Sequence, residues 1–251
     1  MLFRVCILAL VSIFGLVPFC NAQGLPRTGS GKPDLHGIWL TNSRAAYNLE
    51  GHVARTDLLA GLSVVEGGEI PYLPQARVVQ QQNFASRLTS DPLRNCFFPG
   101  VPRIMAMDFP FQITQTDEHV AITFEWTQVY RLLYTTGEPS LYEGIDSWMG
   151  HSRGRWDGDV LVVDVKDFND KTWLDASGNF HSAAMSLTER YELLDANTIR
   201  YEVTVTDPQV FSRPWVMRYE LKRQTDFERL LEYQCQAEKE ELSGDFERDS
   251  K

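Results

Sequence analysis

From residue 111 onward, apolar and polar side chains alternate at every second position, and this alternation limits the fold more than any other feature. In the segment 198–206, Ile199, Tyr201, Val203 and Val205 share one face, and the residues between them are polar. A period of two is typical of a β-strand with one buried face. The chain is therefore predicted to be mainly β. Further segments of this kind lie at 120–126, 130–134, 150–156, 159–165, 187–194 and 215–222.

Short turns join these segments, which favours antiparallel strands. Asp157-Gly158 is a strong signal for a tight hairpin, and no helical pattern separates the segments as parallel strands would require. We expect an antiparallel β-barrel or a strongly curled sheet, because closure protects the edges of a long sheet. The segment 230–235 is expected to close the sheet. A helix near 75–88, which follows Pro74, is expected to cover one end.

Residues 1–22 have the features of an export signal. Arg4 precedes the uncharged apolar run 6–17, and small residues precede a cleavage site after Ala22. The run is short for a membrane span, so the mature chain is predicted to be periplasmic or secreted, without a span. A lipoprotein signal with lipidated Cys20 is the alternative, although Phe19 before it is larger than such signals prefer.

The rest of the chain divides into three parts: a flexible lead-in at 23–34, one β-rich domain at 35–237 and a disordered acidic tail at 238–251. Hydrophobic residues make up 43% of the chain, which suits a globular fold. The net charge of −10 disfavours binding to nucleic acid or to anionic membranes.

Signal cleavage leaves two cysteines, Cys96 and Cys235. In an oxidising compartment they are expected to form a disulfide, which would tie the end of the domain to the loop before its first clear strand. Two separate buried thiols are the alternative.

Two stretches resemble known families. Gly37-Ile38-Trp39 resembles the Gly-x-Trp opening of lipocalin-like (calycin-type) barrels, in which the Trp plugs the base. The longer stretch 148–164, followed by 168–175 and His181-Ser182, resembles an uncharacterised family of exported proteins from environmental bacteria. That resemblance spans roughly residues 33–236, and implies export and a single β-rich domain but no activity.

Three charged residues share strand faces with apolar residues. Glu189 lies on the same face as Tyr191, and Asp164 on the same face as Val162. Arg131 lies on the same face as Val129 and Leu133. If these faces point into the barrel, the charges form a polar patch inside an apolar pocket, which is the usual form of a small-molecule site. An Arg131–Glu189 ion pair, or the reverse assignment of the faces, would explain the pattern without a ligand.

The segment 168–182 is a long connection between strands, and long connections often carry function. His181 is the natural acid or base near neutral pH, and Asp175 is expected to orient it. The alternative is a folded loop in which these residues make turns. The other candidate ligand-binding residues in or near this loop are Asn169, Asp170, Trp173, Phe180 and Trp148.

The sequence leaves three functions open. The first is an exported barrel that binds a small apolar or aromatic molecule as a carrier or scavenger. The second is a cofactor-free acid–base enzyme of the isomerase, lyase or hydratase type, with His181, Asp175 and Glu189 in its pocket. The third is a carbohydrate- or surface-binding module that uses Trp148, Trp156 and Trp173. The histidines show no metal-ligand spacing and no cofactor fingerprint occurs, so neither a metal nor a cofactor is expected.

Overall fold

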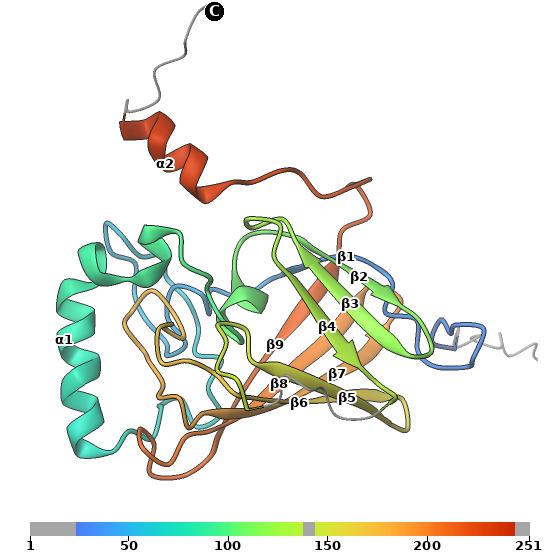
Figure 1. Cartoon of the computed structure of the whole chain (residues 1–251), viewed down its shortest axis with the longest axis horizontal. Helices are drawn as coiled ribbons and strands as arrows, with labels where there is room; N and C mark the ends of the chain where they lie inside the picture. Colours follow the sequence, from blue (N-terminus) through green and yellow to red (C-terminus); the bar gives the residue numbers. More distant parts are fainter. Residues whose placement is uncertain (1–23, 138–143, 244–251) are drawn as a thin grey trace, which may run out of the picture.

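The computed structural model describes residues 24–137 and 144–243, and in these residues nine strands form a closed barrel (Figure 1). The strands follow sequence order around the barrel, and β1 closes it by pairing with both β9 and β2. This confirms the predicted β-barrel. The strands are β1 (Gly37–Thr41), β2 (Phe111–Gln115), β3 (His119–Phe124), β4 (Tyr130–Tyr134), β5 (His151–Asp157), β6 (Val160–Lys166), β7 (Ser186–Asp195), β8 (Thr198–Thr206) and β9 (Trp215–Arg223).

One seam of the barrel differs from the others. All other neighbouring strands are antiparallel, whereas β4 and β5 are parallel and are joined by the single pair Tyr134–Arg153. The antiparallel expectation is wrong at this seam, because the chain between β4 and β5 is a longer connection than a hairpin turn.

Large side chains fill the barrel. On β7 and β8, Tyr191 lies opposite Tyr201 and Leu193 opposite Ile199, and all four side chains are buried. These cross-strand pairs are the unit that stabilises an antiparallel sheet. The predicted alternation on 198–206 therefore does point its apolar face inward.

Trp39 of β1 is fully buried, as the Gly-x-Trp resemblance implies. Its Nε1 donates a hydrogen bond to the Leu35 carbonyl over 3.0 Å. The guanidinium of Arg223 lies over the indole, 4.3 Å from the ring centroid, in a cation–π contact. These contacts fix β1 in the position that closes the barrel.

Outside the barrel, loops and helices gather at one end, on the left of Figure 1. Helix α1 (Pro74–Ser90) confirms the helix predicted near 75–88, and proline at its first turn suits a helix start. It packs on loops, since Gln80 Nε2 donates to the Ser177 carbonyl and Asn83 Nδ2 to the Gly178 carbonyl. The remaining helices are the 3₁₀ helices η1 (Pro92–Asn95) and η2 (Arg103–Ala106) and the α-helix α2 (Cys235–Ser243).

The C-terminal region corrects two predictions. The segment 230–235 is not the closing strand, because β1 takes that place and Tyr233 forms just an isolated bridge with Trp126. The predicted disordered tail is wrong for 238–243, which lie in α2. The disulfide between Cys96 and Cys235 is present. The predicted export signal and residues 244–251 lie outside the described residues. No helix among those described is long and apolar enough to cross a bilayer.

Candidate functional site

Arg131 and Glu189 both point into the barrel and form a buried, two-pronged ion pair. Arg131 Nη1 and Nη2 donate to Glu189 Oε1 and Oε2 over 3.2 and 2.6 Å. The hydroxyls of Tyr191 and Tyr201 donate to the same carboxylate over 3.0 and 2.5 Å. Of the interpretations that the sequence left open, the geometry matches the ion pair.

The two charges of this network, on Arg131 and Glu189, stabilise each other. Burial opposes the charge of Arg131, but the attraction of Glu189 outweighs it and raises the pKa of the guanidinium. Burial, followed by the charge of Glu189, raises the pKa of Tyr191 and of Tyr201 well above the usual value. Both tyrosines therefore stay protonated and donate. The carboxylate receives four hydrogen bonds, which leaves little capacity for a ligand.

A small cavity of about 140 Å³ lies at the β4–β5 seam. Arg131 lines it, and Arg131 Nη2 also donates to Ser152 Oγ across the seam over 3.0 Å. Three further cavities of residues 24–137 and 144–243 lie beside α2, in the loop 48–63 and next to the turn at 115–117. Of the residues predicted to be catalytic or ligand-binding, Arg131 alone lines one of these four cavities.

Asp164 does not point into the barrel, so its predicted inward orientation is wrong. Its side chain is 53% exposed, it pairs with Arg155, and it accepts a hydrogen bond from Thr188 Oγ1. The inward residues of β6 include Leu161 and Val163. Strand β6 has apolar residues on both faces, and the period of two gave the wrong face there.

His181 and Asp175 are both buried but form no hydrogen bond with each other, so the predicted catalytic pair is wrong. His181 Nδ1 donates to the Ser182 carbonyl over 2.9 Å, and Nε2 accepts from Thr172 Oγ1 over 2.6 Å. Burial lowers the pKa of His181. The imidazole is therefore neutral, and both of its nitrogens hold the loop.

Asp175 holds the same loop together from another point. Its carboxylate accepts from the backbone N–H groups of Leu49, Ser177 and Asn179 and from the side-chain amide of Asn179. Burial raises the pKa of Asp175 to about 6. The segment 168–182 is thus the folded loop that was the alternative to a catalytic segment.

The remaining candidates from this loop are dispersed. Asn169 Oδ1 accepts from the backbone N–H of Lys171 in a turn, and Asp170 is exposed. Trp173 and Phe180 face each other in an isolated bridge.

Trp148 stacks on Phe97, with ring centroids 5.3 Å apart. No ring contact within 24–137 and 144–243 joins Trp148, Trp156 and Trp173, so these residues show no common stacking platform.

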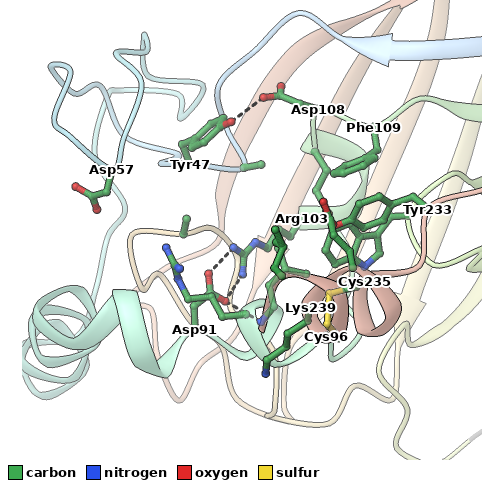
Figure 2. Close-up of a pocket in the computed structure, with 18 residues that line it drawn as sticks. Tyr47, Asp57, Asp91, Cys96, Arg103, Asp108, Phe109, Tyr233, Cys235 and Lys239 are labelled. Carbon is green, nitrogen blue, oxygen red and sulfur yellow. Dashed lines mark hydrogen bonds and ion pairs between the residues drawn. A yellow bond between two sulfur atoms is a disulfide. The ribbon is translucent and has the colours of Figure 1, made fainter. Parts of the chain in front are cut away.

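The best-built cavity is a cleft of about 540 Å³ beside α2, which we call the α2 cleft (Figure 2). Segments far apart in the sequence line it: the loops at 46–47 and 57, η1 with Cys96, the stretch from Arg103 to Phe109, Trp126, and α2 with Tyr233. A cavity of about 660 Å³ is larger but is lined by the single loop 48–63, where Leu62 is 90% exposed. The walls of the α2 cleft are therefore more rigid than those of the cavity in the loop 48–63.

One wall of the α2 cleft is aromatic. Tyr233 stacks on Trp126 with centroids 4.9 Å apart, and Phe109 contacts both rings at 4.6 and 5.2 Å. Burial and a hydrogen bond to Glu238 raise the pKa of Tyr233 to about 12. Such rings offer large apolar area with little loss of entropy on binding.

The acidic side chains of the α2 cleft have partners. Asp91 forms a buried two-pronged pair with Arg103 at 2.7 Å for both contacts, as Figure 2 shows. Asp108 accepts from the Tyr47 hydroxyl over 2.8 Å and pairs with Arg44. Asp57 pairs with Arg87 at 2.7 Å and Glu238 accepts from Tyr233.

Two cations of the cleft have no acidic partner. Among the residues described, neither Arg94 nor Lys239 forms an ion pair, and Lys239 Nζ donates to the neutral amide of Asn95. Glu238 likewise forms no ion pair among the residues described, because its partner is the neutral Tyr233 hydroxyl. The unpaired charges at this cleft are thus two positive and one negative, in a chain with a net charge of −10. The cleft therefore favours an anion.

Sequence reasoning missed this site, although it predicted the disulfide that borders it. The aromatic wall comes from three positions, Phe109, Trp126 and Tyr233, with no common period. A disulfide that joins the loop at 96 to the C-terminal segment was the available signal, since it brings two of the lining segments together.

Comparisons with known proteins add little to this description. No protein-family model matches the chain, and no curated protein matches it. One similar solved structure is the crystal structure of a mutant of the fluorescent protein UnaG, at 12% identity, with 76% of this chain and 97% of that chain covered. The TM-score is 0.32, so the assignment of a barrel rests on the strand pairing itself.

Proposed function

We propose that the protein is an exported binding protein, a carrier or scavenger, for a small molecule with an aromatic or apolar body and a negative charge. The observation that carries this proposal is the α2 cleft, which combines an aromatic wall with two cations without an ion pair, Arg94 and Lys239, against one acid without an ion pair, Glu238. Its volume of about 540 Å³ is in the range of small-molecule sites.

The cleft is a better candidate for this ligand than the barrel interior. Large side chains such as Trp39, Tyr191 and Tyr201 are fully buried inside the barrel. The ion pair of Arg131 with Glu189 is already saturated by hydrogen bonds. A ligand there would have to displace well-packed side chains, which is costly.

A fluorescent aromatic anion, anilinonaphthalene sulfonate, tests the proposal. Reversing both cations in the variant Arg94→Glu/Lys239→Glu is expected to weaken its binding about tenfold, since two exposed charges each contribute up to about 1 kcal/mol. Arg213→Glu reverses a cation on the loop before β9 and is the matched control, which should bind like the wild type. The uncharged analogue phenylnaphthylamine should not distinguish the charge variants.

The apolar half of the site has its own variant. Tyr233→Ala removes one ring of the aromatic wall and should weaken both probes. Circular dichroism confirms that each variant is folded. If neither Tyr233→Ala nor the double charge reversal changes the affinity of the sulfonate probe, the ligand does not lie in the α2 cleft and the proposal is wrong.

Export rests on the signal-like residues 1–22. N-terminal sequencing of the protein recovered from its native compartment is expected to begin at Gln23, and an intact Met1 would contradict export by cleavage.

A further inference from the structure

The disulfide Cys96–Cys235 is placed where it controls one wall of the α2 cleft. Cys235 is the first residue of α2, and Glu238, Lys239 and Leu242 of that helix line the cleft. Both cysteines line it as well, as Figure 2 shows for the disulfide. The bond that anchors α2 therefore borders the cleft, with Cys235 itself 8% exposed.

Few other contacts hold α2 in place. Cys235 is its buried residue, whereas Leu242 is 83% exposed. Lys239 Nζ donates to Asn95 Oδ1 over 3.2 Å in an exposed hydrogen bond. Before the helix, the Tyr233 carbonyl accepts from the Thr127 N–H and its ring stacks on Trp126. The chain is thus anchored firmly up to Tyr233. Beyond that point, the described contacts are the disulfide and two hydrogen bonds, from Tyr233 to Glu238 and from Lys239 to Asn95.

A helix of this length does not persist on its own. The nine residues of α2 are fewer than the roughly 12–15 that an isolated helix needs to be marginally stable in water. Without the covalent bond, α2 has little apolar surface with which to dock. Loss of the disulfide should therefore release α2, while Tyr233 stays in the aromatic wall.

We propose that this disulfide is a thiol-operated latch on the α2 cleft, closed when oxidised and open when reduced. This inference rests on the proposed function, since the regulated site is the same. The reductant is a dithiol. One of its thiolates attacks a sulfur of the Cys96–Cys235 bond, the displaced cysteine takes up a proton, and the second thiol of the reductant then releases the other cysteine. Two electrons and two protons pass to the protein, and the dithiol becomes a disulfide.

The latch has a reciprocal consequence. A ligand in the α2 cleft lies against the sulfur atoms and against α2, so it blocks the approach of a dithiol. If reduction weakens binding of the ligand, the bound ligand must oppose reduction by the same factor, because the two equilibria are linked. The proposal therefore predicts that reduction releases the ligand and that bound ligand protects the disulfide from reduction.

The first test needs no ligand. Folded wild-type protein is treated with dithiothreitol, and amide hydrogen exchange is followed in α2 and in the barrel. Exchange at residues 239–243 is expected to rise to nearly the rate of an unfolded peptide, while β7 and β8 remain protected. The full-length variant Cys96→Ser/Cys235→Ser should show the fast exchange with or without dithiothreitol. Unchanged protection of α2 after reduction would overturn the latch, whatever the cleft binds.

The second test uses the sulfonate probe. Reduction is expected to weaken its binding roughly tenfold, and saturating probe should lower the equilibrium constant for reduction of the disulfide by dithiothreitol by the same factor. The variant Tyr233→Ala, measured in the oxidised state, distinguishes the proposed binding site from the proposed latch. If this variant weakens binding but reduction does not, the binding site stands and the latch is wrong. If α2 is released on reduction but neither change affects the probe, the proposed binding site is wrong.

Discussion

At the scale of single residues, buried polar groups organise the loops outside the barrel. Asp175 is fully buried, yet it receives hydrogen bonds from three backbone N–H groups that come from two segments, at Leu49 and at 177–179. Unpaired buried N–H groups are costly, so this one side chain fixes two loops at once. Asp175, which the sequence suggested as a catalytic residue, therefore holds these loops together.

The ionisation of Asp175 predicts a pH dependence of stability. Its pKa is about 6 in the folded protein against an ordinary value of 3.8, so the folded state takes up a proton before the unfolded chain does. Lowering the pH from about 6 to about 4 should therefore raise the stability of the wild type relative to Asp175→Asn, by roughly 2 kcal/mol. Urea unfolding of both proteins across this range measures the difference.

The comparison with Asp175→Asn removes the opposing contribution of His181. Burial lowers the pKa of His181, so His181 destabilises the folded state as the pH falls below about 6.5, but it does so equally in both proteins. A stability difference that shrinks on acidification would mean that the N–H donors, and not burial, control the Asp175 carboxylate.

At the scale of elements, the docking of α1 on the loop 168–182 depends on a glycine. Gly178 has a φ of +78°, and a Cβ there would lie 2.6 Å from Asn83 Cβ and 2.8 Å from the backbone N of Phe84. Both atoms belong to α1. The helix can approach the loop this closely because residue 178 has no side chain.

Gly178→Ala should therefore destabilise the protein by roughly 3 kcal/mol or more, from the left-handed φ and from the collision with α1. Gly67→Ala is the matched control, because Gly67 has a φ of +84° but no atom within 4 Å of the position of its Cβ. The control should lose only the backbone cost, about 1–2 kcal/mol. If both variants lose the same free energy of unfolding in thermal or urea experiments, α1 can move away from residue 178 at no cost and the prediction is wrong.

The elements themselves were largely predictable, for local reasons. The period of two located β4 and β8 at the observed residues, and Pro74 marked the start of α1. The predictions that failed concern features that depend on tertiary contacts. Nothing in the short segment 37–41 indicates that it pairs with both β2 and β9, and so the sequence favoured 230–235 as the closing strand. The α2 cleft was equally hidden, because it is assembled from segments that the fold alone brings together.

At the scale of the whole molecule, the barrel is closed unevenly. Strands β7 and β8 pair along nearly their full length, whereas β4 and β5 share the single pair Tyr134–Arg153. The hydrogen bond from Arg131 Nη2 to Ser152 Oγ is a further tie across the seam. Local opening has the lowest free energy where few such bonds must break. The barrel is therefore expected to open first between β4 and β5.

Native-state hydrogen exchange tests this order of opening. Amides of β4 should exchange orders of magnitude faster than those at Tyr191 and Tyr201 in the middle of β7 and β8. Ser152→Ala removes a hydrogen bond to a charged group, which contributes about 1.5–3 kcal/mol, and should speed exchange in β4 about tenfold or more while leaving β7 and β8 unchanged. Acceleration spread evenly over all strands would mean that Ser152 supports the barrel as a whole, and that the seam is not a separate unit of opening.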